Sequence, residues 1–105
     1  MRVRTEFEAY IVKYANRYVL VPTKENKELL AALANKRGKM TLIYDSNVYE
    51  LEVTISDNPQ YGAVIFLPTS LDPTWKKLHE TGALLKAIVE VGDDGNNKEL
   101  WTQGW

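Results

Sequence analysis

Residues 6–11, Glu-Phe-Glu-Ala-Tyr-Ile, recur without a gap as residues 50–55, Glu-Leu-Glu-Val-Thr-Ile. Apolar side chains occupy every second position in both stretches, which is typical of a strand that buries one of its faces. In the first stretch, Phe7, Ala9 and Ile11 share that face. The recurrence predicts that the chain contains two copies of one structural unit.

The flanking sequence extends this likeness. In each half a second apolar strand ends in Pro-Thr, at residues 22–23 and 68–69, and a helix ends in glycine, at Gly38 and Gly82. Proline stops a strand because it has no backbone N–H, and glycine closes a helix in the left-handed conformation. We therefore expect two strand–strand–helix–strand repeats, residues 5–45 and 49–91, followed by a tail, residues 92–105.

The first helix is expected over residues 24–36. Thr23 precedes it and has the hydroxyl group that an N-cap uses to accept a backbone N–H. Leu29, Leu30 and Leu33 form an apolar stripe at helical spacing, so all three are expected to face the core.

The second helix is expected to begin at Asp72 as its N-cap, with Pro73 at the first helical position. Trp75 and Leu78 lie three residues apart and are expected to face the core. The six expected strands are residues 6–14, 18–21, 40–44, 48–55, 62–67 and 83–91.

Two units are too few for a solenoid, which needs about three or more. They suit two halves of one closed barrel, because closure removes the exposed strand edges that invite aggregation. The expected fold is a single domain, residues 1–105. It is mainly β with two short helices (α+β), a pseudo-two-fold closed β-barrel.

An apolar strand ending in proline, a short helix, a glycine and another apolar strand make a pattern that resembles the AbrB/MazE-like and double-psi barrels, grouped as cradle-loop barrels. The resemblance covers roughly residues 5–91, and residues 18–44 and 64–90 would supply the two units of one barrel, as in double-psi barrels. Thr69-Ser70 replaces the basic residue that the family carries beside the second helix start. No family site residue is therefore carried over.

The chain has no cysteine, which excludes disulfides, thiolate metal sites and cysteine nucleophiles. Small secreted domains usually carry cysteines, so a cytoplasmic location is expected. No apolar run reaches the length of about 18 residues that a membrane helix needs, so no membrane partner is expected.

Charge is divided unevenly along the chain. Residues 1–45 contain nine Lys or Arg and five acids, whereas residues 46–105 contain four Lys and nine acids. Such a division can mark a face that binds a polyanion, and it can favour head-to-tail contact between copies. It can also reflect a charge match between the two halves of one barrel.

The basic residues of the first half are the candidate nucleic-acid contacts of a transcription-regulator-like protein. Four of them flank the first hairpin, and three cluster at the expected end of the first helix. Lysines and arginines in such places also occur as ordinary solvated surface. The candidates are Arg2, Arg4, Lys13, Arg17, Lys36, Arg37 and Lys39.

Trp101 and Trp105 lie in the polar tail. Tryptophan is enriched at binding hot spots, so the tail is a candidate docking segment for a protein partner or a second copy. The alternative function is accordingly a protein-interaction adaptor. A further alternative is that the tail folds back over an open end of the barrel.

Catalysis is not expected. Residues 45–47, Asp-Ser-Asn, follow a strand like the catalytic turn of aspartic proteases, but those enzymes need a second carboxylate in the same place. We interpret the segment as a hairpin turn. His79, the single histidine, is interpreted as a surface residue. No metal and no cofactor are expected.

Overall fold

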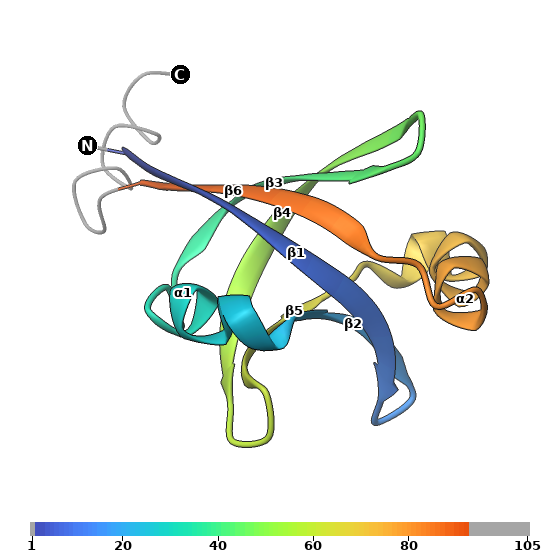
Figure 1. Ribbon diagram of the computed structural model, residues 1–105, viewed down its shortest axis with the longest axis horizontal. Helices are drawn as coiled ribbons and strands as arrows, with labels where there is room; N and C mark the ends of the chain where they lie inside the picture. Colours follow the sequence, from blue (N-terminus) through green and yellow to red (C-terminus); the bar gives the residue numbers. More distant parts are fainter. Residues whose placement is uncertain (1, 93–105) are drawn as a thin grey trace.

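A computed structural model of the chain describes residues 2–92, and of Arg2 it describes the backbone only. Two helical segments and six strands make up this part (Figure 1). The 3-10 turn η1 (Lys24–Asn26) leads into α1 (Lys27–Ala31), and η2 (Thr69–Leu71) leads into α2 (Asp72–Glu80). The strands are β1 (Arg2–Tyr14), β2 (Arg17–Pro22), β3 (Arg37–Tyr44), β4 (Asn47–Asn58), β5 (Gly62–Phe66) and β6 (Leu85–Gly92).

The strands close into a barrel in the order β1-β2-β5-β4-β3-β6, and every neighbouring pair is antiparallel. Exchanging the two repeats, so that β1, β2 and β3 replace β4, β5 and β6, leaves every neighbour relation unchanged. The axis of this pseudo-two-fold symmetry passes between β3 and β6 on one side and between β2 and β5 on the other. The mainly-β, pseudo-two-fold closed barrel with two short helices is confirmed.

The interior of the barrel follows the alternation of the sequence. Phe7, Ala9 and Ile11 are buried on β1, and Val53 and Ile55 are buried on β4, all in the main core. On β5, Ala63 and Ile65 join this core. Val64, between them, packs against Val19 and Val21 in a second cluster on the other face of the strands. The almost wholly apolar strand β5 is therefore buried on both faces, because the main core covers one face and the second cluster covers the other.

The first helix is shorter than predicted. α1 ends at Ala31, not near residue 36, and Leu29 is 45% exposed, although Leu30 and Leu33 are buried as expected. The amide of Asn35 donates to the carbonyl of Ile55 at 2.6 Å, and the amide of Ile55 donates to the carbonyl of Lys36 at 2.9 Å. Pairing with β4 therefore begins at residue 35, and these backbone groups are no longer available to a helix.

Thr23 and Gly38, predicted to cap the two ends of this helix, do not have these roles. Thr23 makes no capping bond to a backbone amide, and its Oγ1 accepts from the side-chain amide of Asn26 at 2.6 Å. Asn35, with φ 71°, takes the left-handed position expected of Gly38. Gly38 lies inside β3, whereas Gly82, with φ 66°, follows α2 as predicted, so the two glycines are not structurally equivalent.

Gly38 is required by a close approach of two strands. It pairs with Val91 of β6, and a Cβ atom at this position would overlap the backbone carbonyl oxygen of Glu90. Backbone cannot move aside as the end of a flexible side chain can. Glycine is therefore the residue that lets β3 and β6 pair here.

α2 closes the barrel end that lies near the β1–β2 hairpin (Figure 1). The side chain of Trp75 is fully buried, its Nε1 donates to the Pro68 carbonyl at 2.9 Å, and its ring meets that of Tyr49 edge-on at 5.5 Å. Asp72 is the first residue of the helix rather than its N-cap, since the turn η2 already brings the chain into helical geometry at that point.

Replacing Gly38 with alanine should lower the free energy of unfolding by about 1–3 kcal/mol, because the added methyl group forces β3 away from β6. Gly82→Ala is the matched control, since a Cβ there meets nothing within 4 Å and only the positive φ is unfavourable. Urea unfolding followed by circular dichroism measures both. Equal destabilisation by the two changes would contradict the close-approach explanation.

Candidate functional site

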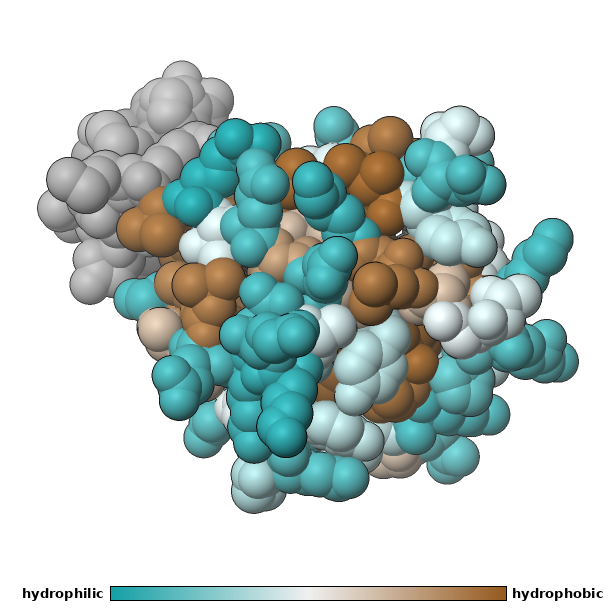
Figure 2. Space-filling model, viewed as in Figure 1, coloured by the Kyte–Doolittle hydropathy of each residue, from teal (hydrophilic) through white to brown (hydrophobic). Residues whose placement is uncertain are grey.

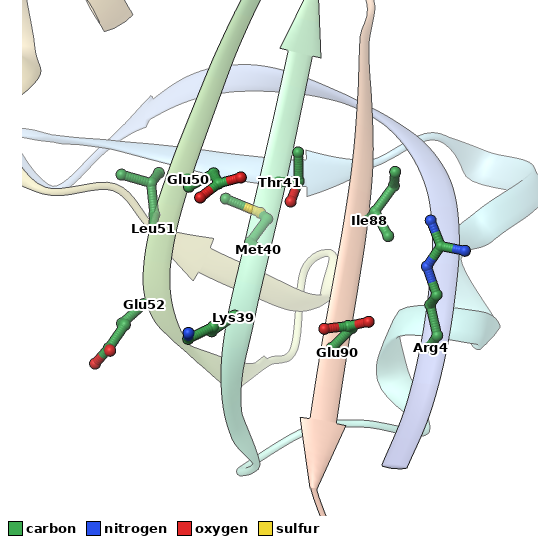
Figure 3. A pocket seen from close by; sticks show the side chains of 9 residues that line it. All are labelled: Arg4, Lys39, Met40, Thr41, Glu50, Leu51, Glu52, Ile88 and Glu90. Carbon is green, nitrogen blue, oxygen red and sulfur yellow. The ribbon is translucent and has the colours of Figure 1, made fainter.

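The outer face of β1, β6, β3 and β4 carries a hollow of about 600 Å³ (Figure 3). Every second residue of these strands points away from the core and towards this face. The hollow therefore lies on the outside of the barrel, across its pseudo-two-fold axis. Its lining residues are Arg4, Lys39, Met40, Thr41, Glu50, Leu51, Glu52, Ile88 and Glu90.

Cations and carboxylates alternate across this face. The strand registers pair Arg4 with Glu90, Glu90 with Lys39, and Lys39 with Glu52, and Figure 3 shows the four side chains in this order on neighbouring strands. Adjacent strands are about 4.8 Å apart, so each charge has an opposite charge as its neighbour. Arg4 also contacts Glu6 along the same strand, with Nη2 and Oε2 3.6 Å apart. The face as a whole is mixed in charge.

One corner of the face is basic. β6 lies between β1 and β3, so the start of β3 and the start of β1 lie on either side of the end of β6. Arg4, Arg37 and Lys39 are exposed there, and Lys36, also exposed, immediately precedes β3. The backbone of Arg2 pairs with Gly92 in the same corner. We call Arg4, Lys36, Arg37 and Lys39 the basic corner.

The other two candidate cations, Lys13 and Arg17, lie at the opposite end of β1, in the β1–β2 hairpin. The Nζ of Lys13 lies 5.6 Å from the ring centre of Tyr18. The Nη2 of Arg17 donates to the Leu67 carbonyl at 2.7 Å, and the guanidinium lies 5.1 Å from the ring centre of Phe66. The Arg17 side chain therefore joins β2 to the end of β5.

The remaining candidates of the sequence fall into three places. Trp101 and Trp105 lie outside the described residues. Asp45 and Ser46 form the turn between β3 and β4, as interpreted from the sequence, with Asp45 at φ 60°. His79 is exposed on α2, and its ring lies 5.8 Å from that of Tyr18.

Within residues 2–92 the structure contains no group of three or more His, Asp or Glu side chains that could hold a metal ion. In the same part of the chain, no helix has the length and apolar character that crossing a bilayer requires. The surface in Figure 2 shows apolar residues separated by hydrophilic ones rather than one continuous apolar patch.

Sequence reasoning grouped the basic residues by their position along the chain and missed the acids among them. Glu52 and Glu90 are far from Lys39 in the sequence, yet both lie beside it on neighbouring strands. The alternation of residues 50–55 was a signal that Glu50 and Glu52 point outwards. Nothing in it could show which cations they would meet.

No family model matches the chain, and neither the curated proteins nor the solved structures contain a match to it.

Arg17→Ala should lower the free energy of unfolding by about 1–3 kcal/mol, because the change removes a charged hydrogen bond to the Leu67 carbonyl and the contact with Phe66. Lys13→Ala, in the same hairpin, should change it by about 0.5 kcal/mol or less, because Lys13 is exposed. Urea unfolding of both variants is the measurement. An Arg17→Ala protein as stable as Lys13→Ala would show that the Arg17 contacts do not stabilise the barrel.

Proposed function

We propose that this chain is a non-enzymatic binding domain of the transcription-regulator-like kind, and that its basic corner contacts the phosphates of a nucleic acid. The observation that carries the proposal is the placement of β6 between β1 and β3, which gathers cations from residue 4 and residues 36–39 at one corner. Arg37 and Lys39 point to the same side of β3, about 7 Å apart. No ion pair of Lys36, Arg37 or Lys39 occurs within the described residues.

The corner is small, and this limits the expected affinity. Four cations neutralise at most about four phosphates, so the logarithm of the binding constant should fall with the logarithm of salt concentration with a slope of about −3 to −4. Glu52 and Glu90 beside Lys39 weaken the field further. We therefore expect weak binding with little sequence preference, since phosphate contacts carry no sequence information.

The double variant Arg37→Glu, Lys39→Glu should lower the affinity for a fluorescein-labelled DNA duplex by roughly tenfold or more, because it replaces two phosphate contacts with repulsion. The matched control is Lys76→Glu, Lys77→Glu, which reverses two exposed charges on α2. Fluorescence anisotropy over a series of salt concentrations measures both. Wild-type binding that does not change with salt, or equal losses in the two variants, would refute the proposal.

A protein-interaction adaptor is the second candidate function. The hollow favours it, because the half-buried Leu51 and Ile88 contribute apolar lining between charges of both signs, and protein surfaces offer the same mixture. The tail with Trp101 and Trp105 is proposed as its docking segment. Deletion of residues 98–105 should then abolish partner capture while the melting temperature stays unchanged, and capture by the truncated protein would reject that role.

We also propose that the barrel is a cradle-loop barrel of the AbrB/MazE-like or double-psi type. Support comes from the closed six-stranded barrel and from the exchange symmetry of its two strand–strand–helix–strand repeats. In this interpretation, both units of a barrel that the AbrB type builds from two chains are contributed by one chain.

A further inference from the structure

Two strands of the barrel are longer than their partners on one side. β1 and β4 have 13 and 12 residues, whereas β2 and β5 have six and five. β5 pairs with residues 55–58 of β4, and the rest of β4 pairs with β3 alone. In the same way, β2 pairs with residues 9–14 of β1, and the first half of β1 pairs with β6 alone. Within residues 2–92, each long strand therefore has one open edge.

The open edge of β4 exposes backbone groups. The amide and carbonyl of Ile55 bond towards β3, as shown by their partners Lys36 and Asn35. Backbone groups alternate in direction along a strand, so those of Val48, Glu50 and Glu52 point the other way. Within the described residues, β5 pairs with residues 55–58 of β4 only, and no turn or loop bond reaches the backbone groups of Val48, Glu50 and Glu52. Val48, Glu50 and Glu52 are also exposed.

β1 has the matching edge. The Glu8 carbonyl accepts from the Thr23 amide at 3.0 Å, so the backbone groups of Glu8 point away from β6. By the same alternation the backbone groups of Arg4 and Glu6 point away from β6. Within the described residues, β2 pairs with residues 9–14 of β1 only, and no turn or loop bond reaches these groups. Arg4 is exposed, and Val3 is 46% exposed although its side chain belongs to the inward-facing set.

The side chains make the two edges complementary. Placing Arg4 opposite Glu50 in an antiparallel pair also places Val3 opposite the half-buried Leu51, and Thr5 opposite Tyr49. Two β4 edges side by side would instead bring the carboxylates of Glu50 and Glu52 together, which is destabilising. Both side chains of the existing Arg4–Glu6 ion pair are exposed, so this pair contributes little to stability. Breaking it to pair Arg4 with Glu50 therefore costs little free energy.

We propose that the open edge of β4 binds the open edge of β1 of a second copy of this chain, as antiparallel strands, with Arg4 opposite Glu50 of the other copy. The contact joins different surfaces of the two copies, so it is head-to-tail and builds rings or open chains. At this contact Arg4 of β1 lies against the acidic β4, which contains Glu50, Glu52 and Asp57 and no Lys or Arg. The proposal is independent of nucleic-acid binding.

The contact is short, and its buried area is smaller than that of a standard-sized interface. We therefore expect weak association, with a dissociation constant of about 10 µM to 1 mM. Sedimentation velocity of the full chain over a concentration series, without nucleic acid, measures it. Arg4→Glu alone and Glu50→Lys alone should each weaken association roughly tenfold, because each places like charges opposite one another. Lys76→Glu, on α2, is the charge-matched control and should leave association unchanged.

Two combinations give the decisive result. An equimolar mixture of the Arg4→Glu and Glu50→Lys proteins should associate more strongly than either protein alone, because Glu at position 4 of one copy then faces Lys at position 50 of the other. The double variant Arg4→Glu, Glu50→Lys should recover self-association for the same reason. A wild-type protein that stays monomeric at about 1 mM, or a mixture no larger than its components, would overturn the proposal.

A backbone variant tests the strand pairing itself. Glu50→Pro removes the amide that points to the open edge and leaves the ladder with β3 intact, so it should abolish association while the circular dichroism spectrum is retained. If Glu50→Pro does not fold, the charge exchange still decides. The Arg37→Glu, Lys39→Glu protein should associate as the wild type does, so failure of this proposal is distinguishable from failure of nucleic-acid binding. Association that survives both Arg4→Glu and Glu50→Pro would point to a different contact.

Discussion

The β6 strand is paired along almost its whole length on both edges, with β1 on one side and β3 on the other. This double pairing closes the barrel, and it needs the backbones of β3 and β6 to approach closely at Gly38, where a side chain would overlap the Glu90 carbonyl. The same pairing places the start of β1 and the start of β3 on the two sides of the end of β6. Arg4 and residues 36–39, which are far apart in the sequence, are thereby brought to the two sides of the β6 end, and the basic corner is the result.

The opposite side of the barrel is closed less completely. β2 and β5 are short, and they pair through Val19–Phe66 and Leu20–Ile65, with one further bond from the Leu67 amide to the Tyr18 carbonyl at 3.1 Å. The two helical segments follow these short strands, and α2 covers one barrel end through Trp75, while Leu30 and Leu33 of the first helical segment join the same core. β2 and β5 are too short to pair with the whole length of β1 and β4. The open edges therefore have the same cause in both repeats.

The alternation of residues 6–11 and 50–55 was sufficient to predict which side chains face the core, because burial on a strand has a period of two residues. The helix prediction failed for residues 32–36, although alanine and leucine favour a helix there. The Asn35 amide donates to the Ile55 carbonyl and the Ile55 amide donates to the Lys36 carbonyl, so the next strand starts early, and tertiary pairing outweighs local propensity. The prediction that Gly38 ends the first helix is wrong, because Gly38 lies inside β3, where the close approach of β6 requires glycine.

For the candidate site, composition showed the basic first half and the acidic second half, and the structure decided where these charges meet. Four of the candidate cations, Arg4, Lys36, Arg37 and Lys39, come to one corner. Lys13 and Arg17 lie at the opposite end, where Arg17 donates to the Leu67 carbonyl. The sequence by itself determined the doubled unit, the strands and the inward faces, because these depend on neighbours along the chain. Only the tertiary structure decided the register, the interleaved acids and the open edges, because these depend on how residues of different strands are paired.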